Sequence, residues 1–159
     1  MKAVVKVKLL NGQIPLKVFD KGEYIDLRAN ETISLTNRGP VTITNIPLGV
    51  AMELPKGLMA RVYSRSSTPS KFGVMIANSV GIIDNHYCGN DDEWQCPVLP
   101  LRKTTINKGD RIAQFEICLS PKATIWQKIK WLFTSKIEFK YVSNLSNTNR
   151  GGFGTTGKN

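Results

Sequence analysis

Residues 50–63, Val-Ala-Met-Glu-Leu-Pro-Lys-Gly-Leu-Met-Ala-Arg-Val-Tyr, place two short apolar stretches on either side of Pro55, Lys56 and Gly57. Short apolar runs bounded by proline and glycine are typical of β-strands. Similar stretches follow at residues 74–83, 94–101 and 112–119, with turn-forming residues between them. Strands this short and this closely spaced predict an all-β fold, a sandwich, jelly roll or barrel, in place of repeated β-α-β units.

The beginning of the chain alternates between apolar and charged residues. Apolar residues at positions 5, 7 and 9 enclose Lys6 and Lys8, which is the period of a strand with one buried face. A secretory signal would place its charges first and continue with an unbroken apolar stretch, so we interpret this segment as a strand. Residues 41–44 alternate in the same way and predict another strand.

Residues 120–142 break the β pattern. Ser120 and Pro121 offer a helix N-cap followed by a proline in the first turn. Apolar residues then recur at helical spacing, with Lys128 and Lys130 between them; they are Ile125, Trp126, Ile129, Leu132 and Phe133. We therefore predict a short amphipathic helix, followed by a strand over residues 136–142.

The composition sets limits on the class of protein. The chain has 159 residues, which is room for one domain. It has 22 Lys and Arg against 12 Asp and Glu, and this net charge of +10 favours phosphate-bearing partners or an anionic surface without selecting either. No apolar run approaches the ~18 residues of a membrane span. Three cysteines without a C-x-x-C pair predict free thiols in a reducing cytoplasm.

The C-terminal segment carries the first motif suited to chemistry. Residues 143–159 contain little to bury, which predicts a mobile tail. Within it, Arg150-Gly-Gly-Phe-Gly-Thr-Thr-Gly157 combines an arginine, glycines and hydroxyl groups that could hold a phosphate, and Phe153 could stack on a base. The end of this motif resembles a Walker A loop, but Asn159 replaces its Ser or Thr. A flexible, solubilising tail is the alternative interpretation.

Two internal motifs carry polar groups at the ends of predicted strands. Arg65, Ser66 and Ser67 follow an apolar stretch and could contact phosphate or form a capped turn. Residues 78–89, Asn-Ser-Val-Gly-Ile-Ile-Asp-Asn-His-Tyr-Cys-Gly, run from an apolar strand into Asp84. An aspartate at a strand end can act as a general base or can serve only to form a turn.

Taken in order, these segments resemble the five motifs of the trimeric deoxyuridine triphosphatases (dUTPases). The matching segments are 22–29 (Gly-Glu-Tyr-Ile-Asp-Leu-Arg-Ala), 65–67 with 71–73, 78–89, 109–114 (Gly-Asp-Arg-Ile-Ala-Gln) and 150–157. Each motif alone is modest evidence, whereas five in order are specific. The sequence departs from the family pattern at three places. The family usually follows its tyrosine with x-Gly-Glu, whereas here Cys88-Gly89 leads to Asn90-Asp-Asp-Glu-Trp94. Ile25 stands where a smaller or aromatic residue is common, and residues 120–140 have no counterpart.

The resemblance implies a jelly-roll-like distorted β-barrel and a homotrimer with active sites between subunits. It divides the chain into a β core over residues 1–119, a basic insertion over 120–142 and a glycine-rich tail over 143–159 that closes an active site. The implied reaction is Mg²⁺-dependent hydrolysis of dUTP to dUMP and pyrophosphate in the cytoplasm, which is the host cytoplasm if the protein is viral. The insertion before the last motif suggests a phage-type member.

The resemblance also assigns roles to individual residues. Asp84 is implied to be the general base that activates water for attack on the α-phosphorus, and Asp26 to contact Mg²⁺ through water. The phosphate chain is assigned to Arg65, Ser66, Ser67, Gln114, Arg150, Gly154, Thr155 and Thr156. The base and sugar are assigned to Asn78, Gly81, Tyr87 and Phe153, with Tyr87 excluding a 2′-hydroxyl.

Two alternatives remain open. A dCTP deaminase of the same superfamily shares an Arg-Ser-Ser segment, although such enzymes are expected to lack Tyr87 and the Arg-Gly-Gly-Phe-Gly tail. A binding or regulatory protein of this fold, with a protein partner at residues 120–140, is the other, because Trp126, Trp131 and Phe133 cannot all lie on one narrow helix face. The competing interpretation is that this helix packs on the barrel or between subunits.

Several conspicuous residues are expected to be structural. His86 and Cys88 lack the spacing of a zinc deaminase. Arg111 is expected to form an ion pair, and Trp94 to lie in the core. Because five lysines and one glutamate fall in residues 120–140, the positive charge is divided between a nucleotide site and the insertion, and neither nucleic-acid nor membrane binding is expected.

Overall fold

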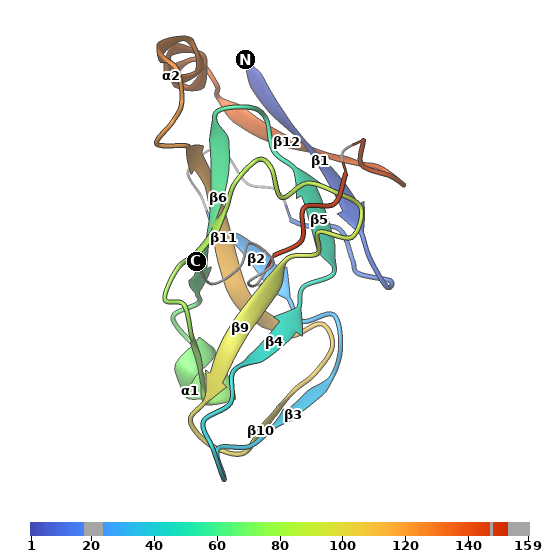
Figure 1. Cartoon of the computed structure of the whole chain (residues 1–159), viewed down its shortest axis with the longest axis vertical. Coiled ribbons are helices and arrows are strands. Elements are labelled where there is room, and N and C mark those ends of the chain that lie inside the picture. Colours follow the sequence, from blue (N-terminus) through green and yellow to red (C-terminus); the bar gives the residue numbers. More distant parts are fainter. Residues whose placement is uncertain (18–23, 147, 153–159) are drawn as a thin grey trace.

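A computed structural model describes residues 1–17, 24–146 and 148–152 (Figure 1). Four of the residues implied to bind substrate, Phe153, Gly154, Thr155 and Thr156, lie outside the described residues. The strands of the described part are β1 (Lys2–Leu9), β2 (Ile25–Arg28), β3 (Ile33–Leu35), β4 (Thr44–Pro47), β5 (Val50–Glu53), β6 (Leu58–Ser64), β7 (Val74–Ile76), β8 (Gly81–Ile83), β9 (Gln95–Pro100), β10 (Thr104–Ile106), β11 (Arg111–Leu119) and β12 (Lys136–Tyr141). Its helices are α1 (Thr68–Phe72) and α2 (Ile125–Leu132).

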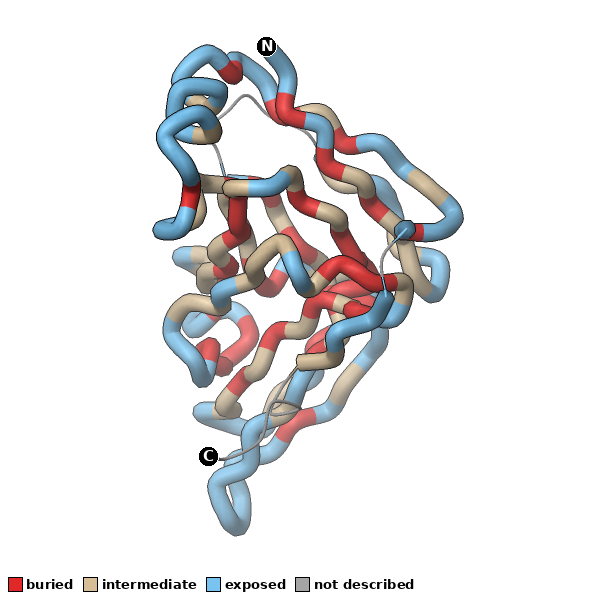
Figure 2. The backbone as a smooth tube through the Cα atoms, turned by 45° about the horizontal axis from the view of Figure 1, so that its top comes forward, coloured by how far each residue is buried: buried red, intermediate tan, exposed pale blue. Residues whose placement is uncertain are grey.

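The strands form small sheets that wrap around one core. Their orders are β12-β1-β5, β10-β3, β2-β11-β6-β8 and β4-β9-β7. Every pairing in the described part is antiparallel except that of β1 with β12. This mostly β arrangement confirms the predicted jelly-roll-like fold, and buried residues lie along the strands in the middle of the molecule (Figure 2).

The alternating segment at the N-terminus forms strand β1 with one buried face, as predicted. Val5 and Val7 are fully buried, whereas Lys6 turns outward and pairs with Glu53 at 3.0 Å. The register of β12 against β1 runs from Lys2 opposite Lys136 to Val7 opposite Tyr141. Ile137 and Phe139 of β12 are buried in the same core, so this strand packs with the barrel although it lies within residues 120–142, which were assigned to the insertion.

Two local predictions are wrong. Residues 41–43 are not a strand: Val41 is 83% exposed, and β4 begins at Thr44. Helix α2 does not begin at Ser120, whose hydroxyl accepts from the N–H of Lys122 in a turn. Its N-cap is Thr124, which forms a capping box with Gln127. The two reciprocal hydrogen bonds of a capping box stabilise a helix start at Thr124 more than the Ser120-Pro121 pair stabilises a start at Ser120.

The predicted amphipathic helix is confirmed, but its apolar face does not pack on the barrel. Trp131 packs against the core, while Trp126, Leu132 and Phe133 are 76%, 75% and 68% exposed. Ile125 is also exposed. The apolar stripe of α2 therefore faces away from the barrel. The helix lies at the end of the molecule opposite β3 and β10 (Figure 1).

Candidate active site

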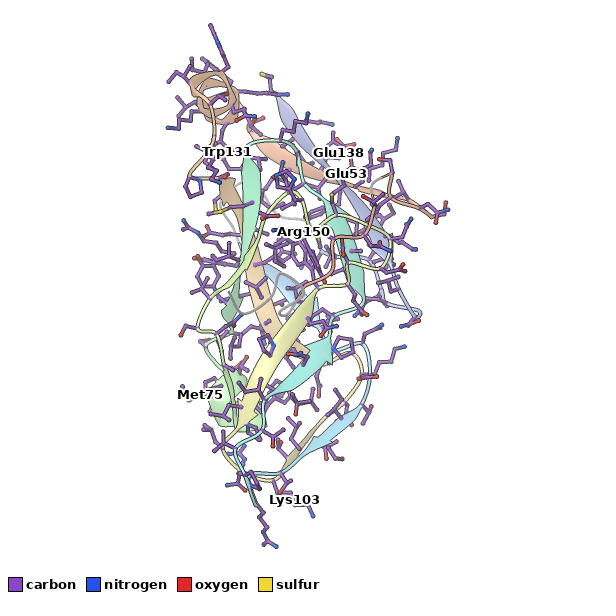
Figure 3. The ribbon with its side chains drawn as sticks, in the orientation of Figure 1. Glu53, Met75, Lys103, Trp131, Glu138 and Arg150 are labelled. Atoms are coloured by element: carbon purple, nitrogen blue, oxygen red, sulfur yellow. The ribbon has the colours of Figure 1, made fainter. Side chains whose placement is uncertain are left out.

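A cavity of about 270 Å³ lies beside β8 and the turn that follows it. It brings together five of the predicted site residues: Asn78, Gly81, Asp84, Tyr87 and Arg150. The first four come from the third motif, and Arg150 comes from the C-terminal segment. In Figure 3, Arg150 lies in the middle of the molecule, below Glu53 and above Met75. The cavity therefore joins parts of the chain that are distant in sequence.

The short strand β8 shapes one wall of this cavity. It pairs with β6 so that Gly81 lies opposite Val62. A Cβ atom on Gly81 would lie 3.3 Å from the Val62 Cβ and 3.7 Å from the Asn78 Nδ2. Glycine at this position leaves that space open beside the Asn78 amide, which can both donate and accept hydrogen bonds.

Tyr87 is held rigidly at the same cavity. Its hydroxyl donates to the carbonyl of Glu93 at 2.8 Å. Burial, together with the nearby charges of Asp92 and Glu93, raises the pKa of Tyr87 to about 12, so the ring stays neutral at physiological pH. A neutral, half-buried aromatic ring is suited to packing against an uncharged part of a ligand.

Asp84 follows directly after β8 and presents its carboxylate to the cavity. The carboxylate accepts from the His86 N–H at 2.9 Å and from Nη1 of Arg150 at 2.9 and 2.8 Å. Partial burial would raise the pKa of Asp84, but the hydrogen bonds from Arg150 and the His86 N–H outweigh it and lower the pKa. The side chain is therefore ionised at neutral pH.

A second group of predicted residues gathers around the end of β6. Asp26 accepts from Nε of Arg65 at 2.6 Å and from Nη1 of Arg111 at 3.0 Å. The ion pair predicted for Arg111 is therefore confirmed. Gln114 donates to the carbonyl of Ser64 at 3.1 Å. Beyond the strand, the exposed Ser66 is followed by Ser67 at the N-cap of α1.

The two groups lie at opposite ends of β6. Ile83 pairs with Ala60, which places Asp84 beside Met59, whereas Arg65 lies six residues further along the same segment. At ~3.3 Å per residue, the two positions are about 20 Å apart along the strand. Within the described residues of one chain, the carboxylate in the cavity and the arginine-serine group do not meet.

The sequence motifs did not identify every residue of the site. Trp94, buried in the core as predicted, also lines the cavity with Gln95, Cys96 and Pro97. Asp92 is buried and accepts from the backbone N–H groups of Arg150 and Gly151. The signal for Asp92 was present, because the segment 90–94 is where the sequence departs from the family pattern, but nothing local linked it to the tail.

An all-β barrel with an ionised strand-end aspartate beside a tyrosine, and with a separate arginine-serine group, has the features of a nucleotide hydrolase. The comparisons with known proteins agree. The sequence model of the dUTPase family matches residues 24–157. The chain belongs to the dUTPase family and is a dUTP diphosphatase, which hydrolyses dUTP to dUMP and pyrophosphate.

Its relatives include enzymes of prophages and phages. A SPbeta prophage-derived deoxyuridine 5'-triphosphate nucleotidohydrolase of Bacillus subtilis is 40% identical over 96% of this chain and 97% of its own. The Staphylococcus bacteriophage 80alpha dUTPase superposes with a TM-score of 0.62 and 23% identity, over 76% of this chain and 93% of its own. A point mutant of the dUTPase from phage phi11 of S. aureus, described with a structural Mg(II) ion, gives a TM-score of 0.60 and 22% identity, over 76% and 94%.

Proposed function

We propose that Asp84 is the general base of dUTP hydrolysis. Its carboxylate orients and deprotonates a water that attacks the α-phosphorus in line with the departing pyrophosphate. The observation that carries this proposal is the position of an ionised, strand-end carboxylate in the cavity formed by Asn78, Gly81 and Tyr87. Arg150 covers both oxygens of Asp84, so its guanidinium must move toward the phosphates as substrate enters.

Selection of deoxyuridine is assigned to the same cavity. Asn78 and the backbone around Gly81 pair with the uracil edge, where cytosine would leave buried polar groups unpaired. The rigid Tyr87 ring packs on the deoxyribose and leaves no room for a 2′-hydroxyl. Phe153 closes over the base by stacking. The hydrogen bond from Tyr87 to Glu93 supports this role because it fixes the ring in place.

We assign the phosphate contacts to Arg65, Ser66, Ser67 and Gln114 of a second subunit, with Arg150, Gly154, Thr155 and Thr156 from the tail. The separation of about 20 Å along β6 supports this assignment, because one chain does not bring both groups to the same nucleotide.

The assembly proposed is a homotrimer with its sites between subunits. Its location is the cytoplasm, or the host cytoplasm for a phage enzyme, and the three free cysteines are compatible with it. Neither helix of the described part is long and apolar enough to cross a membrane.

The residues near the proposed phosphate site are compatible with Mg²⁺. The described residues contain no cluster of three or more His, Cys, Asp or Glu side chains that could bind a metal directly. Asp26 uses its two oxygens to accept one guanidinium hydrogen bond each, and each oxygen can accept a further one from a metal-bound water. The ion would then be held chiefly by the three phosphates, where it neutralises part of their charge.

Release of pyrophosphate tests this function directly. Wild-type protein with Mg²⁺ is expected to hydrolyse dUTP in strong preference to UTP, dCTP and dTTP, without releasing ammonia. The Asp84→Asn variant keeps the size of the side chain but removes the base, and should lose at least about 100-fold in kcat. Normal turnover by this variant would contradict the role of Asp84. Ammonia from dCTP would instead indicate the deaminase alternative.

We also propose a protein partner for α2. Ile125, Ile129 and Leu132 recur at i, i+4 and i+7 on the face turned away from the barrel, the spacing of a helix that docks in a groove. Lysines border this face, and Glu138, the only acidic residue of 120–140, pairs with Lys2 at 2.9 Å. The partner that fits is an apolar groove with an acidic rim. A second copy of α2 fits poorly, because it would bring lysines together.

A phage enzyme of the same fold is described as having a second role besides dUTP hydrolysis. The 80alpha dUTPase is described as controlling the transfer of virulence genes by a proto-oncogenic G protein-like mechanism. That description concerns a protein 23% identical to this chain, so it supports only the general idea of a second role for this fold. The observation specific to this chain is the outward apolar face of α2.

A further inference from the structure

The turn formed by residues 89–92 holds the C-terminal arm, defined here as residues 145, 146 and 148–151. Asp92 is only 1% exposed. Its carboxylate accepts from the Arg150 N–H at 2.9 and 3.1 Å and from the Gly151 N–H at 2.9 Å. It also accepts from the N–H of Gly89 at 2.8 Å, within the turn. One carboxylate therefore ties the backbone of the turn to the backbone of the arm.

Two more residues of the turn extend this contact along the arm. Asn90 donates to the Leu145 carbonyl at 3.3 Å and accepts from the Leu145 N–H at 2.8 Å. The N–H of Asp91 donates to Oδ1 of Asn149 at 2.8 Å, and Nδ2 of Asn149 donates to the Asp91 carboxylate at 2.5 Å. Three consecutive residues of the turn thus bind residues of the arm by specific, directional hydrogen bonds.

Gly89 provides an independent sign of close docking. A Cβ atom at this position would lie 2.4 Å from Cα and 2.6 Å from N of Asn149. The φ angle of Gly89 is outside the left-handed region, so its backbone conformation is open to any residue. Glycine is required at position 89 because the backbone of the arm at Asn149 occupies the space of a Cβ atom, and not because of the backbone geometry of the turn.

We propose that the turn 89–92 is the docking site of the C-terminal arm and that Asp92 is the positioning residue that fixes Arg150 over the cavity. A buried carboxylate that accepts several backbone N–H groups makes charge-assisted hydrogen bonds, which are among the stronger polar contacts in proteins. Burial would raise the pKa of Asp92, but these N–H donors lower it, so the acceptor stays ionised. The importance of the arm for turnover rests on the proposed function of Arg150; the docking itself does not.

Tryptic cleavage after Arg150 measures docking without any assay of activity. Because the N–H groups on both sides of the Arg150–Gly151 peptide bond donate to Asp92, this bond is held away from a protease. Cleavage releases a C-terminal peptide that begins at Gly151 and is recognised by its mass. Asp92→Asn and Gly89→Ala keep the cleavage sequence intact. Each is expected to accelerate this cleavage at least about tenfold in the full chain, the first by loss of a charge-assisted acceptor and the second by a clash.

A reciprocal exchange tests the arm from its own side. Asn149→Asp sets a second carboxylate against Asp91 and should release the arm without touching the barrel. Adding Asp91→Asn restores a donor opposite the new carboxylate and should slow the cleavage again, although the cleavage sequence is the same in both variants. Asp91→Asn alone keeps an acceptor for Asn149 and serves as the control, with cleavage close to the wild-type rate.

Kinetics then separate positioning from structure. In folded Asp92→Asn and Gly89→Ala, kcat/KM for dUTP should fall, while the preference for dUTP over dCTP stays, because the base pocket is unchanged. If Asp92→Asn does not fold, Gly89→Ala and the exchanged pair still give the answer. Unchanged cleavage in Gly89→Ala and Asn149→Asp would overturn the proposal. Faster cleavage with unchanged kcat/KM would leave the docking site in place and count against the function proposed for Arg150.

Discussion

At the scale of single residues, the contact between Arg150 and Asp84 connects the tail with the reaction. Arg150 donates to both oxygens of the proposed base and contributes to its low pKa. The same guanidinium is assigned to the phosphates once dUTP is bound. Under the proposed mechanism, one residue serves two anions in turn: it stabilises the ionised Asp84 in the free enzyme and then releases it as the phosphates bind.

This exchange predicts a change in pH dependence when Arg150 is replaced. If Asp84 is the general base, activity requires its ionised form and is lost as the pH falls through the pKa of this group. In Arg150→Gln, burial is no longer opposed by the guanidinium, the pKa rises, and the acid limb of the kcat/KM profile moves to higher pH. The measurement is kcat/KM for dUTP from about pH 3 to about pH 8, because the ordinary aspartate pKa is about 3.9 and the pKa of the paired Asp84 in the wild type lies lower.

The same variant also loses a phosphate contact, so the absolute rate does not test the pairing. The position of the acid limb does, because it reports the pKa of the free enzyme. A lower kcat/KM with an unmoved limb would mean that Arg150 acts on the phosphates alone. The preference for dUTP over dCTP should remain, which controls for damage to the cavity.

At the scale of secondary-structure elements, local patterns predicted the strands whose one face is buried. Val5 and Val7 in β1, and Phe115 in β11, are all fully buried. Where the pattern failed, a tertiary or capping contact decided the outcome. Val41 has nothing to pack against in this structure's described part, and the Thr124–Gln127 capping box set the start of α2 in place of Ser120.

The helix α2 shows why spacing alone does not reveal which face is buried. The sequence showed an apolar stripe, and a stripe normally packs on the core. In the structure the opposite, polar face of α2 packs on the turn before β6. Gln127 lies so close to Gly57 that a Cβ atom at residue 57 would be 2.6 Å from its side chain. Met1 adds a hydrogen bond from its amino group to the carbonyl of Phe133 at 3.0 Å. These contacts hold the apolar stripe outward.

The proposed partner for α2 predicts binding to a groove of matching chemistry. Ca²⁺-loaded calmodulin, an acidic protein with apolar, methionine-rich grooves, is a suitable probe because its targets are basic amphipathic helices. We expect it to bind the wild-type enzyme, and Leu132→Lys to weaken this binding at least about tenfold through loss of an apolar anchor. Fluorescence anisotropy of labelled calmodulin measures both.

Leu132 is exposed, so its replacement should leave turnover and oligomeric state unchanged. Dissociation of the assembly in Leu132→Lys would show that a second copy of the chain covers the face. Sedimentation of the wild-type enzyme with phosphatidylglycerol vesicles, without binding to calmodulin, would favour a lipid surface. Either result would contradict the protein partner.

At the scale of the whole molecule, the site is divided by the geometry of β6. The sequence motifs predicted both groups of candidate site residues, because each group is a local run of residue types with recognisable chemistry. They carried no information on distance: Asp84 lies beside the start of β6 and Arg65 follows its end, and only the register of β6 with β8 shows this. The contact of Asp92 with the arm was equally invisible, since 58 residues separate its partners.

A site divided in this way predicts complementation between two inactive chains. Asp84→Asn removes the proposed base, and Ser66→Ala removes a hydroxyl from an exposed residue at the other end of β6. If each site takes Asp84 from one subunit and Ser66 from another, each trimer that contains both kinds of chain has both wild-type residues in about one third of its sites. Chains co-expressed with different tags and purified through both should therefore recover activity that neither variant has alone. Variants purified separately and mixed without subunit exchange are the control. A site completed within one chain would recover nothing, because every chain carries one of the two changes, and the trimer would then have no part in building the site.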